Sequence, residues 1–288
     1  MAGQMKMDTQ PAHGDAAEEQ VTHPEDRANA GVRIHGIWKS YGTGDTRSVV
    51  LEGIDLAIQR GEFVSVIGPS GCGKSTLLKV IAGLTDANGG DVTIDGSSVR
   101  SAAKNKMIGL VPQSPALLPW RTVLDNVRLP MKVNRRANGG RNLRSPEDIL
   151  HSFGLGQAID KYPAQLSGGM QQRVAIARAF VFDPSVLLMD EPFSALDEMN
   201  RDQQRLGLLD FWQSNRKTVL FVTHSVPEAI MLSDRIVVMA AHPGRIASII
   251  DVNLPRPRDA DVYATDEFRD LEGEVRSTLR AVMEDQHV

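Results

Sequence analysis

Nine consecutive residues constrain the fold of this chain more than any other stretch. They are Gly68, Pro69, Ser70, Gly71, Cys72, Gly73, Lys74, Ser75 and Thr76. Their order matches the phosphate-binding loop G-x-x-x-x-G-K-[ST], in which glycines allow backbone N–H groups to turn around an anion. An apolar run of strand length (62–67) precedes the loop, and a helical pattern (75–82) follows it. This order of strand, loop and helix predicts a nucleotide-phosphate site at a helix N-terminus.

Individual side chains of this loop have expected roles. Lys74 supplies a positive charge for the β- and γ-phosphates of ATP, and Ser75 supplies a hydroxyl for Mg²⁺. The alternative is a glycine-rich turn that happens to end in Lys-Ser, but the flanking strand and helix disfavour it.

Cys72 is the single cysteine of the chain, so we expect no internal disulfide and a reducing cytoplasm. Alkylation of this thiol is hypothesised to block ATP binding, and ATP to protect the thiol.

Composition limits the classes of partner. Hydrophobic residues make up 41% and charged residues 24%, which is ordinary for a globular protein. No apolar run reaches the roughly 18 residues that a membrane span requires, so we expect none. Residues 1–30 contain two basic and six acidic side chains, and the whole chain has a net charge of −4, so residues 31–288 are neutral. A neutral body gives no net-charge support for a nucleic-acid-binding face, although a local basic patch stays open as an alternative.

Three regions differ in pattern. Residues 1–30 are polar and aperiodic, which predicts a disordered acidic tail, with a partner-binding arm as the alternative. Residues 31–252 are predicted to form the ATP-binding domain, with a helical subdomain at about 114–180. Residues 253–288 are predicted to form an extension that ends in an amphipathic helix, packed on its own domain or on a partner. One stripe of that helix carries Phe268, Leu271, Val275, Leu279 and Val282.

Strand patterns predict two kinds of sheet. Short strand segments in the first half are expected to form antiparallel hairpins; they are residues 32–38, 49–58, 91–96 and 107–111. Continuous apolar runs in the body of the chain are typical of buried parallel strands; they are residues 62–67, 185–189 and 218–223. Helical patterns separate these runs, so the expected fold class is α/β with a parallel sheet covered by helices.

Two carboxylates follow the apolar run that ends at Met189. In a parallel sheet, the carboxyl ends of the strands open into the crevice where ligands bind. Asp190 is therefore placed to hold Mg²⁺, and Glu191 is placed to polarise an attacking water. One carboxylate alone could be a solvated strand end, but two after a buried strand favour a catalytic pair in a chain that has a phosphate-binding loop.

A second anion-binding helix start is predicted at Leu166-Ser-Gly-Gly-Met-Gln-Gln-Arg173. Ser167 can cap the helix, and the two glycines after it expose backbone N–H groups. One ATP requires only one such site within its own chain. We therefore expect this second site to face the ATP that is bound to another molecule.

Together these motifs resemble those of the ATP-binding subunits of ABC transporters. They occur in the order of that family, as the loop at 68–76, Gln113, Leu-Ser-Gly-Gly at 166–169, Asp190-Glu191, Ser-Ala-Leu-Asp at 194–197 and His224. The resemblance covers residues 32–252. It implies a P-loop NTPase fold of ABC type, with a parallel sheet core, an antiparallel β subdomain and a helical subdomain. Met170 departs from the many relatives that carry Gln after the second glycine, which weakens one side-chain contact.

The resemblance also implies roles for single positions. Tyr41 matches the aromatic residue that stacks on adenine; Gln113 matches the residue that touches the metal and the attacking water. Asp197 matches a loop residue that communicates across the dimer, and His224 matches the histidine that senses the γ-phosphate. Taken alone, Tyr41 could be an aromatic residue of a turn, Gln113 an exposed loop amide and His224 a structural histidine.

The expected site residues follow from both lines of reasoning. The catalytic set is Glu191, His224, Gln113 and Lys74, and the metal set is Ser75, Gln113 and Asp190. The nucleotide set is Tyr41, residues 68–76, Gln113, Ser167, Gly168, Gly169 and Asp197. ATP and Mg²⁺ are the implied cofactors, and the implied reaction is hydrolysis of ATP to ADP and phosphate, enabled when two subunits close around the nucleotide.

Transport requires membrane partners, because the chain itself has no expected span. The apolar segment Ser114–Trp120 is odd for a solvated loop and suits a docking surface for a permease subunit. The sequence of residues 117–127, together with Pro-Arg-Pro-Arg at 255–258, is similar to that of the ATP-binding subunits of nitrate, sulfonate and taurine importers. That resemblance implies a peripheral subunit at the cytoplasmic face of the membrane, a homodimer, and a solute-binding protein as an indirect partner.

One other function remains open from sequence, and two more are disfavoured. A soluble ABC-type ATPase that acts in cofactor assembly has compatible spacing between its motifs. A DNA-repair version is disfavoured, because residues 114–165 lack the sustained heptads of an inserted coiled coil. A nucleotide-binding scaffold without hydrolysis is disfavoured by the intact Lys74, Glu191 and His224.

Overall fold

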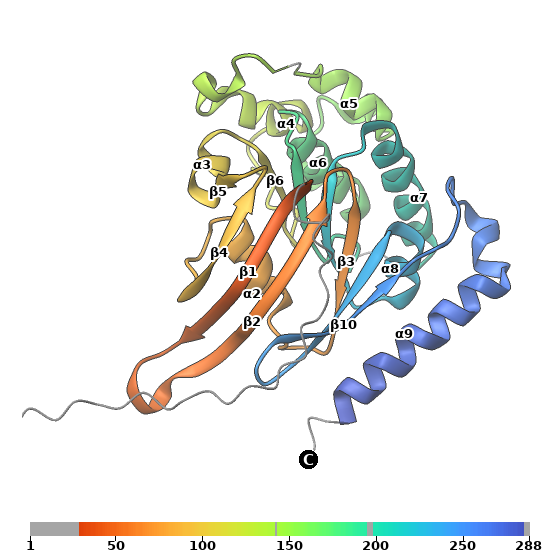
Figure 1. Ribbon diagram of the computed structural model, residues 1–288. Coiled ribbons are helices and arrows are strands. Elements are labelled where there is room, and N and C mark those ends of the chain that lie inside the picture. The colour runs from red at the N-terminus through yellow and green to blue at the C-terminus, as the bar shows by residue number, and fades with distance from the viewer. Residues whose placement is uncertain (1–28, 142, 195–197, 285–288) are drawn as a thin grey trace, which may run out of the picture.

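The computed structural model describes residues 29–141, 143–194 and 198–284, which form two β-sheets surrounded by helices (Figure 1). The core sheet has six strands in the order β10-β9-β3-β8-β7-β6, and the second sheet has four in the order β2-β1-β4-β5. The predicted tail at residues 1–30 lies outside the described residues up to residue 28, and Ala30 already opens β1.

The core sheet is parallel from β9 to β6, and β10 runs antiparallel to β9 at one edge. Its strands are β3 (Phe63–Ile67), β6 (Ile108–Val111), β7 (Val186–Asp190), β8 (Thr218–Val222), β9 (Arg235–Ala240) and β10 (Arg245–Asp251). Every residue of β3 and β8 is buried, as expected for strands covered on both faces. The predicted α/β fold with a parallel core is confirmed, because the carboxyl ends of β3, β6, β7 and β8 share one edge.

One strand belongs to a different sheet from the one predicted. Residues 107–111 were grouped with the antiparallel hairpins, but β6 pairs in parallel with β7 at the edge of the core sheet. Gly109 explains the fit, since a Cβ there would lie 2.7 Å from the carbonyl oxygen of Ala179. The missing side chain lets a helix pack directly on this strand.

The second sheet is antiparallel and lies over one face of the core. It contains β1 (Ala30–Tyr41), β2 (Ser48–Gln59), β4 (Gly89–Ile94) and the short β5 (Ser97–Ser98). Helix α2 (Lys74–Ile81) lies between the two sheets, because Leu77 and Leu78 join one buried cluster with residues of both. Helix α3 (Val99–Lys104) follows β5. The helix after the phosphate-binding loop is thereby fixed from two sides.

Helices cover the opposite face of the core sheet (Figure 1). They are α4 (Val123–Lys132), α5 (Pro146–Ser152), α6 (Gly168–Phe180) and α7 (Glu198–Asn215), with short 3-10 turns between them at Arg135–Asn138, Gly156–Ala158 and Pro163–Gln165. A further 3-10 turn, Gly44–Thr46, connects β1 to β2. Phe63 of β3 meets Trp212 of α7 edge to face, with ring centroids 5.5 Å apart. The predicted helical subdomain at 114–180 contains α4, α5 and α6.

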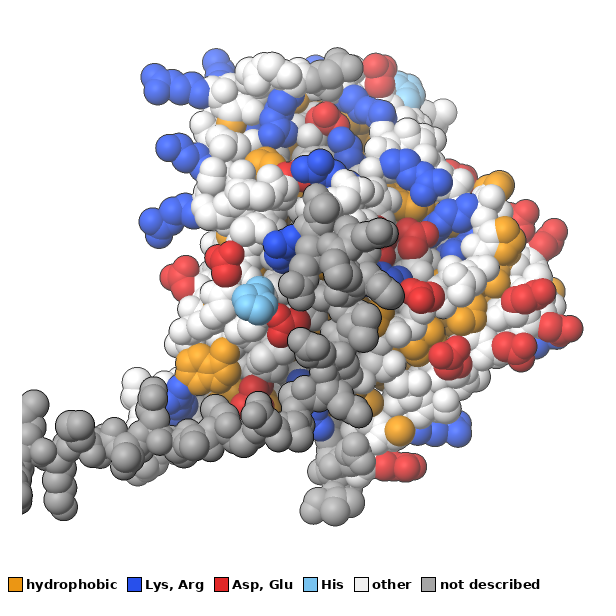
Figure 2. Space-filling model, in the orientation of Figure 1, with side chains coloured by type: hydrophobic (Ala, Val, Ile, Leu, Met, Phe, Trp, Pro, Cys, Tyr) orange, Lys and Arg blue, Asp and Glu red, His pale blue; other side chains and the backbone are white. Residues whose placement is uncertain are grey.

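The carboxyl-terminal segment runs along the side of the core (Figure 1). It comprises η5 (Ala260–Ala264) and α9 (Asp266–Glu284); α9 packs on α8 (Val226–Leu232), β9 and β10, and η5 packs on α9. Phe268, Val275 and Val282 of α9 are buried, whereas Leu271 and Leu279 are partly buried. Carboxylates line the outer side of α9 in Figure 2. Among the described residues, no helix has the length and apolar character needed to cross a bilayer.

Candidate functional site

The phosphate-binding loop forms a tight turn between β3 and α2. A Cβ at Gly68 would lie 2.6 Å from the carbonyl oxygen of Met239, and a Cβ at Gly73 would lie 2.7 Å from Cδ2 of Leu51. Gly73 also has a φ of +94°, which side chains disfavour. The turn therefore depends on glycine at these two positions, both for space and for backbone conformation.

Lys74 lies across this turn. Its buried ammonium donates hydrogen bonds to the carbonyl oxygens of Gly68 at 2.8 Å and Pro69 at 2.9 Å. No side chain caps the start of α2 at Gly73, so its first N–H groups are available to an anion. A cation and a helix N-terminus thus meet at one turn, which fits the phosphates of a nucleotide.

Ser75 and Asp190 provide a pair of oxygen ligands beside the loop. The Ser75 hydroxyl donates to Oδ1 of Asp190 at 2.9 Å. Burial raises the pKa of Asp190 above its ordinary value; the Ser75 hydrogen bond lowers it and the charge of Glu191 raises it further. A bound cation would oppose this rise. Hydroxyl and carboxylate oxygens are ligands that Mg²⁺ accepts together with substrate phosphates, so the donor set fits that ion.

Three strand ends bring their polar residues together around Glu191. Gln113, two residues after β6, donates from Nε2 to Oε2 of Glu191 at 3.3 Å. His224, two residues after β8, has Nδ1 3.4 Å from the same oxygen. Glu191 follows β7 directly, and its N–H donates to the carbonyl oxygen of Val222 at 2.9 Å. The carboxylate is therefore held by its backbone and flanked by an amide and an imidazole.

The backbone of Glu191 is unusual. Its φ is +43°, in the region that favours glycine, and its carbonyl oxygen accepts hydrogen bonds from both N–H and Oγ of Ser194. Strain of this kind persists where the surrounding contacts enforce it, and it is commonest at functional sites. The unusual backbone therefore carries the carboxylate that Gln113 and His224 flank.

The turn at Ser167 is built differently. Ser167 caps α6, because its Oγ accepts a hydrogen bond from the N–H of Met170 at 3.3 Å. Ser167 and Gly168 are exposed, and a Cβ at Gly168 would have no heavy atom within 4 Å. Gly169 is the next residue of the same first turn. Within the described residues, no hydrogen bond or ion pair joins this turn to the phosphate-binding loop or to Glu191.

Two further predicted residues stand apart from this cluster. Tyr41, at the end of β1, is 45% exposed, and the Lys39 ammonium lies 4.9 Å from its ring centroid. An exposed ring at a strand end is available for stacking. Asp197 lies outside the described residues.

Sequence reasoning missed two residues that shape the segment after Gln113. Asn126 is fully buried; its side chain accepts from the N–H of Leu118 and donates to the carbonyl oxygens of residues 118, 121 and 122. Arg178 of α6 donates to the carbonyl oxygens of Pro115 and Ala116, at 2.7 and 2.8 Å. A polar side chain on the apolar face of a helix was the available signal.

These contacts give the segment Ser114–Trp120 a fixed path. Leu117 packs against the core, whereas Trp120 is 70% exposed. The predicted apolar surface is therefore narrower than the sequence indicated, because one of its large side chains points inward. An exposed tryptophan on a fixed loop is a feature of docking surfaces.

Cys72 is enclosed by the loop. Its thiol is fully buried, 3.7 Å from the Lys74 ammonium. Burial raises the pKa of this thiol, and the nearby ammonium opposes the rise only in part. A smaller thiolate fraction and a closed path reduce its reactivity toward alkylating reagents.

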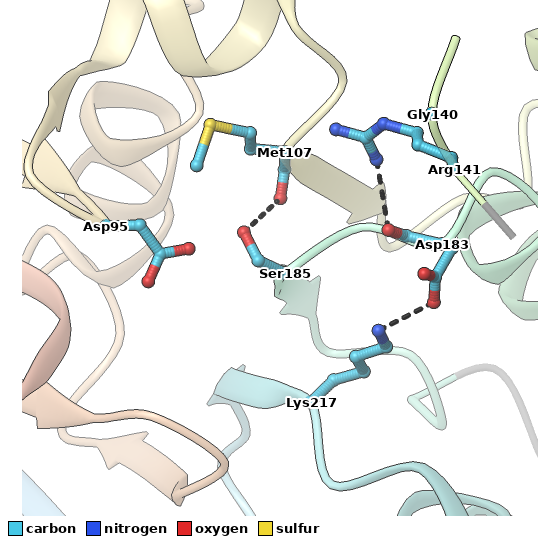
Figure 3. Close-up of a pocket in the computed structure, with 7 residues that line it drawn as sticks. All are labelled: Asp95, Met107, Gly140, Arg141, Asp183, Ser185 and Lys217. Carbon is cyan, nitrogen blue, oxygen red and sulfur yellow. Dashed lines mark hydrogen bonds and ion pairs between the residues drawn. The ribbon is translucent and has the colours of Figure 1, made fainter. Parts of the chain in front are cut away.

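A polar cavity of about 340 Å³ opens at the opposite edge of the core sheet (Figure 3). Its polar side chains are engaged within the chain: Lys217 pairs with Asp183 at 2.6 Å, and Ser185 bonds to the carbonyl oxygen of Met107 at 3.3 Å. It contains none of the predicted site residues; its lining comprises Asp95, Met107, Gly140, Arg141, Asp183, Ser185 and Lys217. The carboxyl edge of the sheet is therefore the candidate site.

Comparison with known sequences finds relatives of one family. A profile of the ABC transporter family matches residues 51–194. An uncharacterised ABC transporter ATP-binding protein of Methanocaldococcus jannaschii is 44% identical over 85% of this chain and 90% of its own. An aliphatic sulfonates import ATP-binding protein of Bacillus cereus is 44% identical over 83% of this chain and 92% of its own. A bicarbonate transport ATP-binding protein of Synechococcus elongatus is 43% identical over 85% of this chain and 37% of its own.

Solved structures show the same architecture. The dimeric ATP-binding cassette MJ0796, bound to ADP and phosphate, has a TM-score of 0.67 and 31% identity over 78% of this chain and all of its own. A second structure, cbiO1 from Clostridium perfringens, has a TM-score of 0.68 and 24% identity over 90% of this chain and supports the fold.

Proposed function

This chain belongs to the ABC transporter family as an ATP-binding protein that hydrolyses ATP, and from that membership we propose that it energises the import of a small anionic solute. The observation that carries the proposal is the 44% identity to the aliphatic sulfonates import protein over 83% of this chain and 92% of that protein. The bicarbonate relative also carries a small anion, by its name. Nitrate, sulfonate and taurine-like solutes therefore form the candidate class. The cofactor-assembly alternative has no comparable support.

Two copies of the chain form each ATP site in this proposal. The phosphate-binding loop of one copy holds the nucleotide from below, with Tyr41 stacked on the adenine. Ser167, Gly168 and Gly169 of the other copy cap the γ-phosphate, and Asp197 contacts the partner. The open turn at Ser167 supports this arrangement, because its helix N-terminus is exposed and Gly168 has free space above it.

Hydrolysis assigns a role to each residue of the Glu191 cluster. Glu191 accepts a proton from the attacking water, while Gln113 and His224 orient that water and the γ-phosphate. Lys74 neutralises phosphate charge that grows in the transition state. Mg²⁺, held by Ser75, Asp190 and Gln113, supplies further positive charge when bound.

The segment Ser114–Trp120 connects this chemistry to a membrane partner. It lies just after Gln113, its path is fixed by Asn126 and Arg178, and it exposes Trp120. We place a permease subunit on it, with this chain at the cytoplasmic face of the membrane. A solute-binding protein acts through that permease, and no nucleic acid takes part.

A catalytic test uses Glu191→Gln in the full chain. The amide cannot accept a proton, so turnover is expected to fall by roughly 100-fold or more, while ATP binding is kept and a dimer accumulates. ATPase assays and light scattering with Mg-ATP measure both. Normal turnover in this variant would remove Glu191 from the proposed role.

A transport test identifies the partner and the solute. The chain is tagged and purified from solubilised membranes of its own cells, and a multi-span protein is expected to copurify. Vesicles that contain the complex should then accumulate labelled sulfonate, nitrate or bicarbonate only when ATP is present on the side of the membrane that carries this chain. Glu191→Gln should abolish this uptake. Copurification with soluble proteins alone would refute the importer proposal.

A further inference from the structure

Helix α8 determines where His224 lies. His224 stands between Thr223, which follows β8, and Ser225, which caps α8. The Thr223 hydroxyl accepts from the N–H of Ser225 at 3.0 Å, so the residues on both sides of His224 are joined. Any displacement of the start of α8 would therefore move His224 relative to Glu191.

The carboxyl-terminal segment holds the far end of α8. Arg258 is 3% exposed and donates to the carbonyl oxygens of Ile230, Met231 and Ser233, at 2.9, 3.2 and 2.7 Å. It also binds the carbonyl oxygens of Val252 and Leu254, at 3.3 and 3.0 Å. Burial lowers the pKa of Arg258 to about 10, so it remains a cation at neutral pH. A cation on the last carbonyls of a helix stabilises that end.

A neighbouring arginine ties the same segment to α7. Arg256 donates to Oδ1 of Asp234 and to the carbonyl oxygen of Leu232, at 2.7 and 2.8 Å from one nitrogen. Its guanidinium lies 4.5 Å from the ring centroid of Trp212, a fully buried residue of α7. The Pro-Arg-Pro-Arg stretch thereby fixes α7 and α8 together.

The same segment reaches the start of α8 through a buried chain of polar contacts. The Thr223 hydroxyl donates to Oε2 of Glu228 at 2.6 Å, and Oε1 of Glu228 lies 3.4 Å from Nε of Arg205. Arg205 then donates from a terminal nitrogen to the hydroxyl of Tyr263 in η5, at 3.3 Å. Thr223, Glu228 and Arg205 are all nearly fully buried. Buried polar groups keep their hydrogen-bond partners, because a buried polar group without a partner raises the free energy of the folded state.

Tyr263 is itself fixed from the outside. Its ring meets Phe268 edge to face, with centroids 5.0 Å apart, and Phe268 is the first buried residue of α9. Val275 and Val282 continue that buried stripe along the core. The position of the Tyr263 hydroxyl therefore depends on the docking of α9.

We infer that the carboxyl-terminal segment is a positioning element for catalysis, in which Tyr263 acts through Arg205, Glu228 and Thr223 on the place of His224. The inference rests on the proposed role of the Glu191 site. It gives residues 253–284 a function beyond covering the core: they set how well the site is assembled when the two copies close.

The decisive variant is Tyr263→Phe in the full chain. It keeps the aromatic packing and removes the oxygen that receives the Arg205 hydrogen bond. We expect kcat for ATP hydrolysis to fall about 5-fold, on the scale of the loss of one ordinary hydrogen bond, with KM and the dissociation constant for ATP unchanged. Arg276→Gln, at an exposed ion pair of the same helix α9, is the matched control and should leave kcat unchanged.

A double-mutant cycle tests the path. Thr223→Val removes the hydroxyl at the other end of the chain of contacts, which Glu228 and Arg205 connect to Tyr263. If the effects travel through Arg205 and Glu228, the double variant should lose less kcat than the product of the two single losses. Independent losses that multiply would overturn the proposed path.

Two outcomes separate this inference from the proposed function. If Glu191→Gln is inactive but Tyr263→Phe has normal kcat, the inference is wrong and the site assignment stands. If Glu191→Gln hydrolyses ATP normally, the site assignment itself fails. The inference would also be overturned if Tyr263→Phe has a lower unfolding temperature and less folded protein, but an unchanged kcat per folded molecule.

Discussion

Two turns in this protein begin helices with glycine and can bind phosphate, yet they are built in opposite ways. At Gly73, the turn is enclosed: a Cβ would collide with Leu51, and Lys74 is bonded to two carbonyls of the turn. At Gly168, the turn is open, and its single capping contact comes from Ser167. The first turn is enclosed by residues of its own chain, whereas the second turn is exposed.

The surroundings explain the difference. The first turn follows β3, which lies between β8 and β9, and the antiparallel sheet supplies Val50 and Leu51 above it. The second turn follows a short 3-10 helix (Pro163–Gln165) and opens α6 at the surface. The same kind of helix start is therefore enclosed by its own chain in one place and exposed in the other.

The largest expected effect separates binding from turnover. Lys74→Ala should abolish ATP binding by single chains, because the charge at the enclosed turn is lost. Gly168→Asp should leave that binding intact and lower turnover by roughly 100-fold, because a carboxylate at the open turn repels the partner's phosphates. Calorimetry at low protein concentration and ATPase assays measure the two effects. Loss of binding in Gly168→Asp would break the comparison.

Mixing these two inactive variants gives the next largest effect. A mixed dimer contains one site with an intact phosphate-binding loop and an intact partner turn. Activity should therefore return to about a quarter of the normal value in an equal mixture, if copies pair at random. A mixture as inactive as its components would show that the two turns do not meet across a dimer.

Stability should distinguish the same two turns without nucleotide. Gly73→Ala places a Cβ against Leu51 at a φ of +94°, and is expected to destabilise the fold by about 2 kcal/mol. Gly168→Ala meets open space and should change stability by less than about 1 kcal/mol, in either direction. Urea unfolding of the two variants gives the difference, and equal losses would contradict it.

Thiol reactivity should give the smallest effect. Burial and a raised pKa slow the alkylation of Cys72 by iodoacetamide at pH 8, because less thiolate is present. A thiol at the open turn, introduced as Gly168→Cys in a Cys72→Ser background, should react at least about tenfold faster. Mass spectrometry follows both rates. Faster labelling of Cys72 would mean that the enclosed turn opens readily.

The sequence was informative where motif order and sheet geometry act together. Because parallel strands end at one edge, residues that follow β6, β7 and β8 had to lie near the phosphate-binding loop. Ser75 next to Asp190, and Gln113 and His224 next to Glu191, follow from that rule. Their roles remain proposals, since proximity alone does not assign chemistry.

The sequence was uninformative where one side chain binds distant backbone. Arg141, Arg178 and Arg258 each donate to carbonyl oxygens from other parts of the chain. A carbonyl looks the same at every position, so no residue pattern identifies the partner of such an arginine. The place of β6 was missed for a related reason, because Gly109 fits a hairpin or a helix-covered strand equally well.

The positive φ of Glu191 has a consequence for attempts to raise the thermal stability of this protein. A glycine at this position would relax the main chain and raise the melting temperature, yet it would delete the carboxylate. Selection for thermal stability alone would therefore tend to remove the Glu191 carboxylate and, with it, ATP hydrolysis. A thermostable variant that still hydrolyses ATP must gain its stability elsewhere in the chain.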